Sequence, residues 1–180
     1  MGTPRNRDQD WFTRTYTDHY AYIVNYGRRR LADADQAAEL AQEVFVVAWR
    51  RRGEVPDHSL PWLYGVARRL LANQWRAARA APAPVPLPHP DLLARHHSGD
   101  PAGATGVADI RVALAGLSAL DQEILRLIGW EELTVAEAAR VLGCTSATAA
   151  VRLHRARRRL ARALATTAPA GLPAPAPAHS

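Results

Sequence analysis

The chain has 180 residues and a formal net charge of +6, which is long enough for one domain or two small ones and favours an acidic partner such as nucleic acid. Its 23 strongly basic residues are all Arg, and its single cysteine, Cys144, excludes an internal disulfide and a cysteine-based zinc site. No apolar run reaches the roughly 18 residues of a membrane span and the N-terminus lacks a signal-peptide pattern, so we expect a cytoplasmic protein.

Two amphipathic helices are predicted near the N-terminus. The first spans about residues 8–31, and its apolar stripe is most simply explained as core, although the aromatic rings could also stack on nucleic acid. That stripe consists of Trp11, Phe12, Tyr16, Tyr20, Ile23 and Val24. The second helix begins at Asp33 or Asp35 and runs to about Arg52. Its wide apolar face consists of Ala37, Leu40, Ala41, Val44, Phe45, Val47 and Ala48.

Three polar residues, Glu39, Gln42 and Glu43, lie together near the N-terminal half of this second helix. Acidic side chains near a helix N-terminus interact favourably with its positive dipole end, which is a purely structural explanation. An acidic patch for a protein partner explains them equally well. The residues alone leave both explanations open.

A loop at residues 53–60 and a basic helix that extends to about Arg79 are predicted next, with Pro61 at the first helical position. The buried face of this helix consists of Leu63, Val66, Ala67, Leu70 and Leu71. Its other faces carry Trp62, Arg68, Arg69, Asn73, Arg76 and Arg79. Since aromatic rings stack on unpaired bases and Arg neutralises the backbone, this helix could hold single-stranded nucleic acid. Alternatively, its tryptophans pack in the core, as we expect for Trp75.

Residues 81–106 are rich in proline, then in small residues, and are predicted to form a flexible linker because no core can form there. His89, His96 and His97 fall in this segment, and without a fixed scaffold they do not predict a metal site. The end of the chain, residues 166–180, is rich in Pro and Ala and is predicted to be disordered.

The stretch after the linker is predicted to form a second helical unit that ends in a helix-turn-helix. A helix from about Ala108 is followed by one that starts at Ser118, and residues 134–164 then read as a short helix, a tight turn and a long helix. Thr134 with Glu137 forms a capping box, and Gly143 suits the left-handed end of the short helix. In such a motif the second helix enters the DNA major groove.

The long helix of this motif is basic on every face but one. Its apolar stripe consists of Ala149, Leu153, Ala156, Leu160 and Leu164, and its arginines are Arg152, Arg155, Arg157, Arg158, Arg159 and Arg162. No acidic residue occurs between Thr145 and Ser180. An ordinary solvated helix is the plain structural explanation. However, charge of one sign repels itself unless a polyanion neutralises it, so we predict DNA binding.

No enzyme motif occurs in the chain: it has no glycine-rich phosphate loop, HExxH, GxSxG or credible Cys–His pair. We therefore predict no catalytic residue, no cofactor, no metal and no small-molecule substrate.

Three segments, in this order, resemble the short extracytoplasmic-function group of bacterial RNA polymerase sigma factors. Residues 37–50, AAELAQEVFVVAWR, resemble the part of region two that docks on the polymerase clamp helices. Residues 60–76, LPWLYGVARRLLANQWR, resemble the helix that melts and reads the minus-ten element. Residues 133–160, LTVAEAARVLGCTSATAAVRLHRARRRL, resemble region four, which reads the minus-thirty-five element.

The resemblance implies an all-α fold with two small helical domains joined by a Pro-rich flexible linker. Region two would occupy residues 8–80 and region four residues 107–165, with the linker at 81–106 and the disordered tail at 166–180. Core RNA polymerase and promoter DNA would be the partners, and an anti-sigma factor would be an inhibitor.

Roles for particular residues follow from the same resemblance. Glu39, Gln42 and Glu43 would face basic residues of the polymerase, and the loop 54–60 would capture a base flipped from the non-template strand. The minus-ten contacts would come from Trp62, acting as a wedge, and from Arg68, Arg69, Asn73 and Arg76. The minus-thirty-five contacts would come from Ser146, Thr148, Ala150, Val151, Arg152, His154 and Arg155.

Two other functions remain compatible with the residues. One is a stand-alone helix-turn-helix regulator whose N-terminal half senses a ligand or dimerises. The other is a helical adaptor whose basic helix binds an acidic protein.

Overall fold

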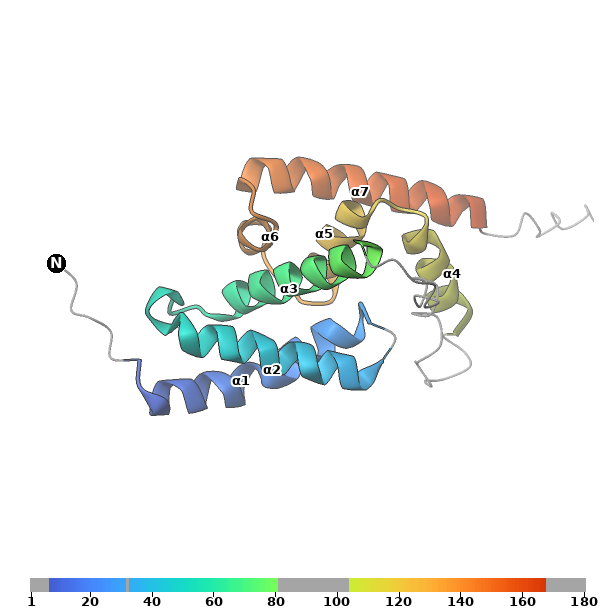
Figure 1. Cartoon of the computed structure of the whole chain (residues 1–180). Helices are drawn as coiled ribbons and strands as arrows, with labels where there is room; N and C mark the ends of the chain where they lie inside the picture. The colour runs from blue at the N-terminus through green and yellow to red at the C-terminus, as the bar shows by residue number, and fades with distance from the viewer. Residues whose placement is uncertain (1–6, 32, 81–103, 168–180) are drawn as a thin grey trace, which may run out of the picture.

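The computed structural model describes residues 7–31, 33–80 and 104–167, which form seven α-helices and one short 3-10 turn and contain no strand. The predicted all-α class is confirmed. The helices are α1 (Gln9–Arg28), α2 (Ala34–Arg50), α3 (Leu60–Ala80), α4 (Ala104–Ala115), α5 (Ala119–Gly129), α6 (Val135–Leu142) and α7 (Ser146–Thr167), with the turn η1 (Arg52–Glu54) before α3 (Figure 1). Among the described residues, no helix meets the length and hydropathy that a membrane span requires.

The N-terminal half, α1 to α3, packs around one apolar core because each helix has a continuous apolar face. A Cβ atom added at Gly27 would lie only 3.0 Å from Cβ of Ala37, so the glycine allows the end of α1 to approach α2 closely. The largest buried side chains of this half are Ile23, Tyr26, Leu40, Phe45, Leu63, Tyr64 and Leu71.

The C-terminal half, α4 to α7, follows the start and stop signals of its sequence. The Ser118 hydroxyl caps α5 by accepting from the amide of Asp121, and Thr134 with Glu137 forms the predicted capping box at the start of α6. Gly143 ends α6 with φ at 69°, in the left-handed region that glycine adopts most easily. A small second core joins α5, α6 and α7; it consists of Ile124, Ala139, Ala149, Leu153 and Ala156.

The two halves share a core and lie directly against each other (Figure 1). Four buried residues of the C-terminal half belong to the same apolar cluster as α1, α2 and α3; they are Leu127, Leu133, Ala138 and Val141. Helix α6 is buried on two sides, since Ala138 faces this shared core and its neighbour Ala139 faces the second one. The region-two and region-four segments therefore form one packed body in this structure.

Some predicted boundaries differ from the observed ones. Helix α4 begins at Ala104, inside the predicted linker, and α7 continues to Thr167, past the predicted start of the tail. Pro61 is the second residue of α3. The rest of the linker, with its three histidines, and the rest of the tail lie outside the described residues.

The prediction that Trp75 packs in the core is wrong, because its side chain is 45% exposed. Trp75 lies near the C-terminal end of α3, beyond the last α3 residue of the shared core, Leu71. Nothing in the described structure covers it fully.

Candidate nucleic-acid interface

The predicted minus-ten residues line up along α3. Arg69, Asn73 and Arg76 are exposed at helical spacing, while Arg68 is half-buried. The Arg76 guanidinium donates from Nη2 to Oδ1 of Asn73 at 2.6 Å and from Nε to the carbonyl of Ala72 at 3.2 Å. These bonds fix the direction of one cation on the surface of the helix. Such a row of guanidinium groups provides the positive charge that a nucleic-acid backbone requires.

Trp62, at the start of α3, is half-buried and packs against the shared core. Trp62 follows the loop closely in the sequence, and part of its side chain stays exposed. The indole is therefore positioned by packing on one side and accessible on the other. This position is compatible with both explanations of Trp62, packing in the core and stacking on unpaired bases.

The loop before α3 is anchored at both ends and pinned by one arginine. Val55 and Ser59 are buried, whereas the residues between them are exposed. The Arg7 side chain, only 5% exposed, donates to the carbonyl of Arg52 at 3.0 Å and pairs with the Asp57 carboxylate at 3.2 Å. The loop is thus held in a defined shape while its tip stays open to solvent.

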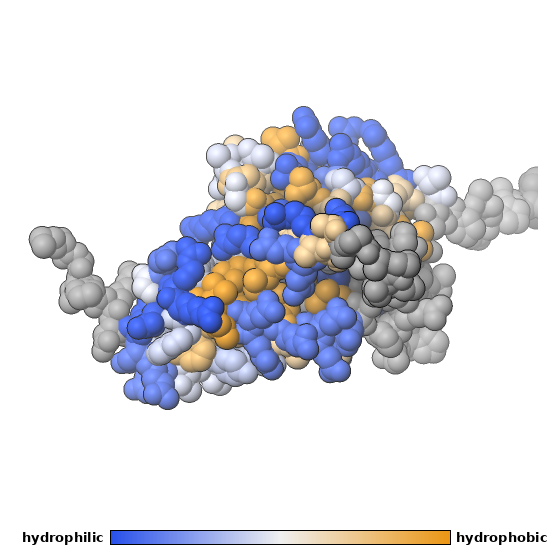
Figure 2. All heavy atoms as spheres, in the orientation of Figure 1, coloured by the Kyte–Doolittle hydropathy of each residue, from blue (hydrophilic) through white to orange (hydrophobic). Residues whose placement is uncertain are grey.

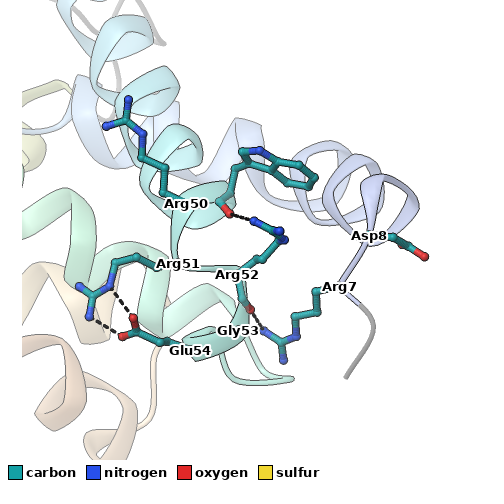
Figure 3. Close-up of a pocket in the computed structure, with 8 residues that line it drawn as sticks. Arg7, Asp8, Arg50, Arg51, Arg52, Gly53 and Glu54 are labelled. Carbon is teal, nitrogen blue, oxygen red and sulfur yellow. Dashed lines mark hydrogen bonds and ion pairs between the residues drawn. The ribbon is translucent and has the colours of Figure 1, made fainter. Parts of the chain in front are cut away.

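A basic pocket of about 590 Å³ lies beside this loop, where α2 ends (Figure 3). It is lined by Arg7, Asp8, Trp49, Arg50, Arg51, Arg52, Gly53 and Glu54. In Figure 3, Arg51 points toward Glu54, with which it forms an ion pair, and Arg52 donates to the carbonyl of Trp49 at 3.1 Å. The hydrogen bonds from Arg51 lower the pKa of Glu54, and the same pair raises the pKa of Arg51. This pocket was not predicted from the sequence, although the run of three arginines at 50–52 is a visible signal.

The predicted minus-thirty-five residues lie on the outer side of α7. The apolar stripe of α7 packs inward, with Ala149, Leu153 and Ala156 buried. All seven predicted residues are exposed except Arg152, which is half-buried; the exposed ones are Ser146, Thr148, Ala150, Val151, His154 and Arg155. One further arginine of this helix, Arg159, forms an ion pair with the buried Asp121 of α5 and so holds α7 in place.

The three predicted partner-binding residues of α2, Glu39, Gln42 and Glu43, are all exposed. Beside Gln42 an apolar groove of about 650 Å³ runs between α1 and α2. Its walls include Val46, which is 47% exposed, and Trp49, which is 39% exposed. Tyr16, expected in the core, packs against Phe45 with 4.8 Å between the ring centroids and a 60° angle between the ring planes, yet stays 37% exposed, because it lines this groove. Figure 2 shows apolar residues exposed on the N-terminal half of the molecule, with hydrophilic residues around them.

Two family descriptions match the chain, one in its N-terminal half and one in its C-terminal half. Sigma-70 region 2 matches residues 15–81, and Sigma-70, region 4 matches residues 108–160. The first match contains α2, the loop and all of α3, and the second contains the helix-turn-helix.

Curated relatives agree with these matches. The ECF RNA polymerase sigma factor SigC of Mycobacterium tuberculosis (strain CDC 1551 / Oshkosh) is 31% identical over 135 residues, which cover 71% of this chain and 69% of that protein. The ECF RNA polymerase sigma factor SigL of Mycobacterium tuberculosis (strain ATCC 25618 / H37Rv) is 29% identical over 151 residues, covering 81% of this chain and 84% of that protein.

Solved structures with the same fold include the sigma factor RpoE of Bartonella quintana, in complex with the anti-sigma factor NepR. It has a TM-score of 0.62 and 24% identity, with 87% of this chain and 98% of that chain covered. CnrH, in complex with the cytosolic domain of CnrY, also has a TM-score of 0.62, with 20% identity and coverage of 89% and 92%.

Proposed function

The chain belongs to the extracytoplasmic-function group of RNA polymerase sigma factors, which direct promoter-specific transcription initiation, and we propose that its two halves divide this work. The N-terminal half docks on core RNA polymerase and melts the minus-ten element, and the C-terminal half reads the minus-thirty-five element. The observation that supports this most directly is the helix-turn-helix of α6 and α7, whose outer face carries arginines and lies within the region 4 match. The chemistry of RNA synthesis belongs to the polymerase.

At the minus-ten element, the loop 54–60 captures a base from the non-template strand and Trp62 stacks at the upstream edge of the bubble. Extruding a base costs on the order of a few kcal/mol, and stacking on an aromatic ring returns about 1–3 kcal/mol per base. Arg68, Arg69, Asn73 and Arg76 hold the backbone or adjacent bases. The anchored loop and the row of cations on α3 support these roles.

At the minus-thirty-five element, the N-terminal part of α7 enters the major groove. Arg152 and Arg155 reach phosphates or base edges, where a bidentate contact discriminates by about 1–3 kcal/mol. Ser146, Thr148, Ala150, Val151 and His154 complete the groove-facing side. Their exposure, opposite the buried stripe of the same helix, supports this assignment.

The partners are core RNA polymerase, promoter DNA and an anti-sigma factor. Glu39, Gln42 and Glu43 provide the acidic surface for the polymerase, and their exposure on α2 supports this role. One solved protein of this fold, the sigma factor RpoE of Bartonella quintana, is bound to the anti-sigma factor NepR, which supports a comparable inhibitor for this chain. Because core RNA polymerase is its proposed partner, we propose that the protein acts in the cytoplasm.

Run-off transcription with purified core polymerase and a promoter library tests the proposal. We expect the chain to start transcription at defined sites and to compete with another sigma factor for core. A stand-alone helix-turn-helix regulator would bind DNA without that competition, and an adaptor for an acidic protein would bind no promoter. Either result would refute the proposed function.

A further inference from the structure

The outer face of α7 changes in chemical character along the helix. From Ser146 to Val151 no side chain carries a charge, whereas six arginines follow between Arg152 and Arg162. In a helix-turn-helix, the N-terminal residues of the second helix contact the base edges. The part of α7 that lies closest to the bases in the proposed function therefore presents small and apolar side chains, and the charges that attract phosphates begin only after it.

Val151 lies at the centre of this uncharged part of the outer face. At about 100° per residue, its position on the helix is nearly opposite that of the buried residues Ala149, Leu153 and Ala156. The Val151 side chain is 51% exposed, more than any other large apolar side chain of α7 that the structure describes. Ala147, one turn earlier, is exposed as well. An exposed valine does not stabilise the helix itself, because β-branched residues have a lower helix propensity than alanine.

Ala147, Ala150 and Val151 together form a small apolar surface, which we call the α7 apolar patch. All three are exposed, and Ala147 is spaced at i+3 and i+4 from the other two, so their side chains are neighbours on the helix. Helix α7 packs against α4, α5 and α6 and lies at one edge of the molecule (Figure 1). The α7 apolar patch therefore remains open to a ligand in the described part of the chain.

Few hydrogen-bonding groups surround the α7 apolar patch. The hydroxyl of Thr148 lies 2.9 Å from that of Thr145, and the Thr145 hydroxyl accepts from the amide of Thr148 at 3.2 Å. Both hydroxyls are thus engaged in the N-terminal cap of α7. Apart from Ser146, side chains with donors to spare begin one turn after the patch centre, with His154 and Arg155.

An apolar side chain in the major groove distinguishes bases by the atoms that it covers. Guanine, adenine and cytosine present hydrogen-bond donors or acceptors there, whereas thymine presents a 5-methyl group beside its acceptor. A valine that covers a donor or acceptor displaces water without replacing its hydrogen bond, which costs free energy. Against the thymine methyl, the same valine buries apolar surface on both sides of the contact, which is favourable.

On these grounds, and resting on the proposed function, we propose that Val151 is a specificity-determining residue of the minus-thirty-five contact and reads a thymine by its 5-methyl group. Ala147 and Ala150 allow the methyl group to approach the helix closely, because their side chains end at Cβ. Arg155, one turn beyond Val151 on the same face, holds the DNA in register through a phosphate or a base edge.

A protein partner fits the α7 apolar patch less well than a methyl group does. A stable protein interface buries roughly 800 Å² on each side. One valine and two alanines, with a run of arginines after them, offer only a small fraction of that area in apolar form. The patch matches a ligand that is itself small in its apolar part and polyanionic beside it, which describes thymine in a DNA strand.

Removal of a single methyl group from the DNA tests the proposal. Holoenzyme made from the full chain and core polymerase first selects its upstream element from a promoter library. Each thymine of that element, on either strand, is then replaced singly by deoxyuridine, which lacks only the 5-methyl group. Competition against a labelled promoter measures the affinities. We expect one of these replacements to weaken binding about fourfold, the effect of exposing one methyl-sized apolar group.

Val151→Ala should remove this difference, so that the variant binds thymine and deoxyuridine at that position equally well. The helix should persist, since alanine is the best helix former. Val112→Ala makes the same change at a valine of α4 that is 64% exposed, so it is the matched control and should keep the preference for thymine. Because the comparison is a double-mutant cycle between one side chain and one methyl group, a general loss of DNA affinity in Val151→Ala cancels out.

A penalty for deoxyuridine that is unchanged in Val151→Ala would overturn the reading of thymine by Val151. A selected upstream element without thymine, or one in which no thymine shows a penalty, would overturn it as well. Holoenzyme that selects no promoter from the library would overturn the proposed sigma-factor activity instead, so the two failures give different results.

Discussion

Arg30 and Glu131 are 101 positions apart in the chain, yet they form an ion pair at 2.9 Å in which each side chain is only 1% exposed. Burial works to lower the pKa of Arg30, but Tyr26, Glu123 and Glu131 outweigh it and raise the pKa above its ordinary value. Arg30 therefore stays charged, and its two carboxylate partners belong to the other half of the molecule. The stability of each half thus depends on the other through this pair.

We expect Arg30→Met to lower the free energy of unfolding by about 3–5 kcal/mol, because it leaves two carboxylates buried without their main partner. Arg28→Met, at the exposed last residue of α1, should have little effect. Urea denaturation followed by circular dichroism measures both. Equal midpoints for the two variants would mean that the halves are not coupled through this pair.

The pKa of Glu137 predicts a dependence of stability on pH. Hydrogen bonds from the Thr134 hydroxyl and amide, and then from His58, lower the pKa of Glu137 below its ordinary value of 4.5. Since the folded pKa lies below the unfolded one, the stabilisation is present above pH 4.5 and is lost as the pH falls through the folded value. Glu137→Gln should therefore destabilise the chain near neutral pH and differ less from wild type in acid.

Unfolding titrations of both proteins across this pH range test that expectation. Asp35→Gln, an exposed acid in the first turn of α2, is the matched control. A free-energy difference between Glu137→Gln and wild type that stays constant with pH would contradict the assigned role of the carboxylate.

Local signals in the sequence predicted much of this fold, and contacts across the chain were not predictable from it. Thr134 and Glu137 are three positions apart, so the capping box can be predicted from the sequence, as can the apolar period of each helix. The pairing of Arg30 with Glu131 depends on how the turn after α1 meets the connection between α5 and α6, which no local pattern encodes. The burial of Trp75 was predicted wrongly for the same reason, since the helical period does not show how far along α3 the packing helices extend.

The candidate site was predicted to a similar degree. The helix period correctly separated the buried stripe of α7 from its exposed basic face. It did not reveal that α6 lies over Gly65, or that Val46 and Trp49 stay exposed beside the acidic residues of α2. Both features arise from tertiary packing.

Trp62→Ala should spare binding to core polymerase but slow promoter opening, because the proposed stacking contributes about 1–3 kcal/mol, or roughly fivefold to 150-fold. Trp75→Ala, at an exposed position of the same helix, is the matched control. Fluorescence anisotropy with labelled core measures binding, and permanganate footprinting measures opening. A loss of core binding in Trp62→Ala would instead indicate that the indole serves only packing.

Glu43→Arg should weaken binding to core polymerase by charge reversal, by about tenfold or roughly 1.4 kcal/mol, because it places a cation against the proposed basic surface. Glu43 is exposed on α2 next to Gln42, which lines the apolar groove, so the substitution should leave the fold intact. Glu132→Arg, an exposed reversal in the C-terminal half, should leave the affinity unchanged. Competition against another sigma factor for core measures both affinities at several salt concentrations. Since salt screens charge pairs at a protein surface, the defect of Glu43→Arg should shrink as salt rises, and a defect that is absent at low salt would remove Glu43 from the docking surface.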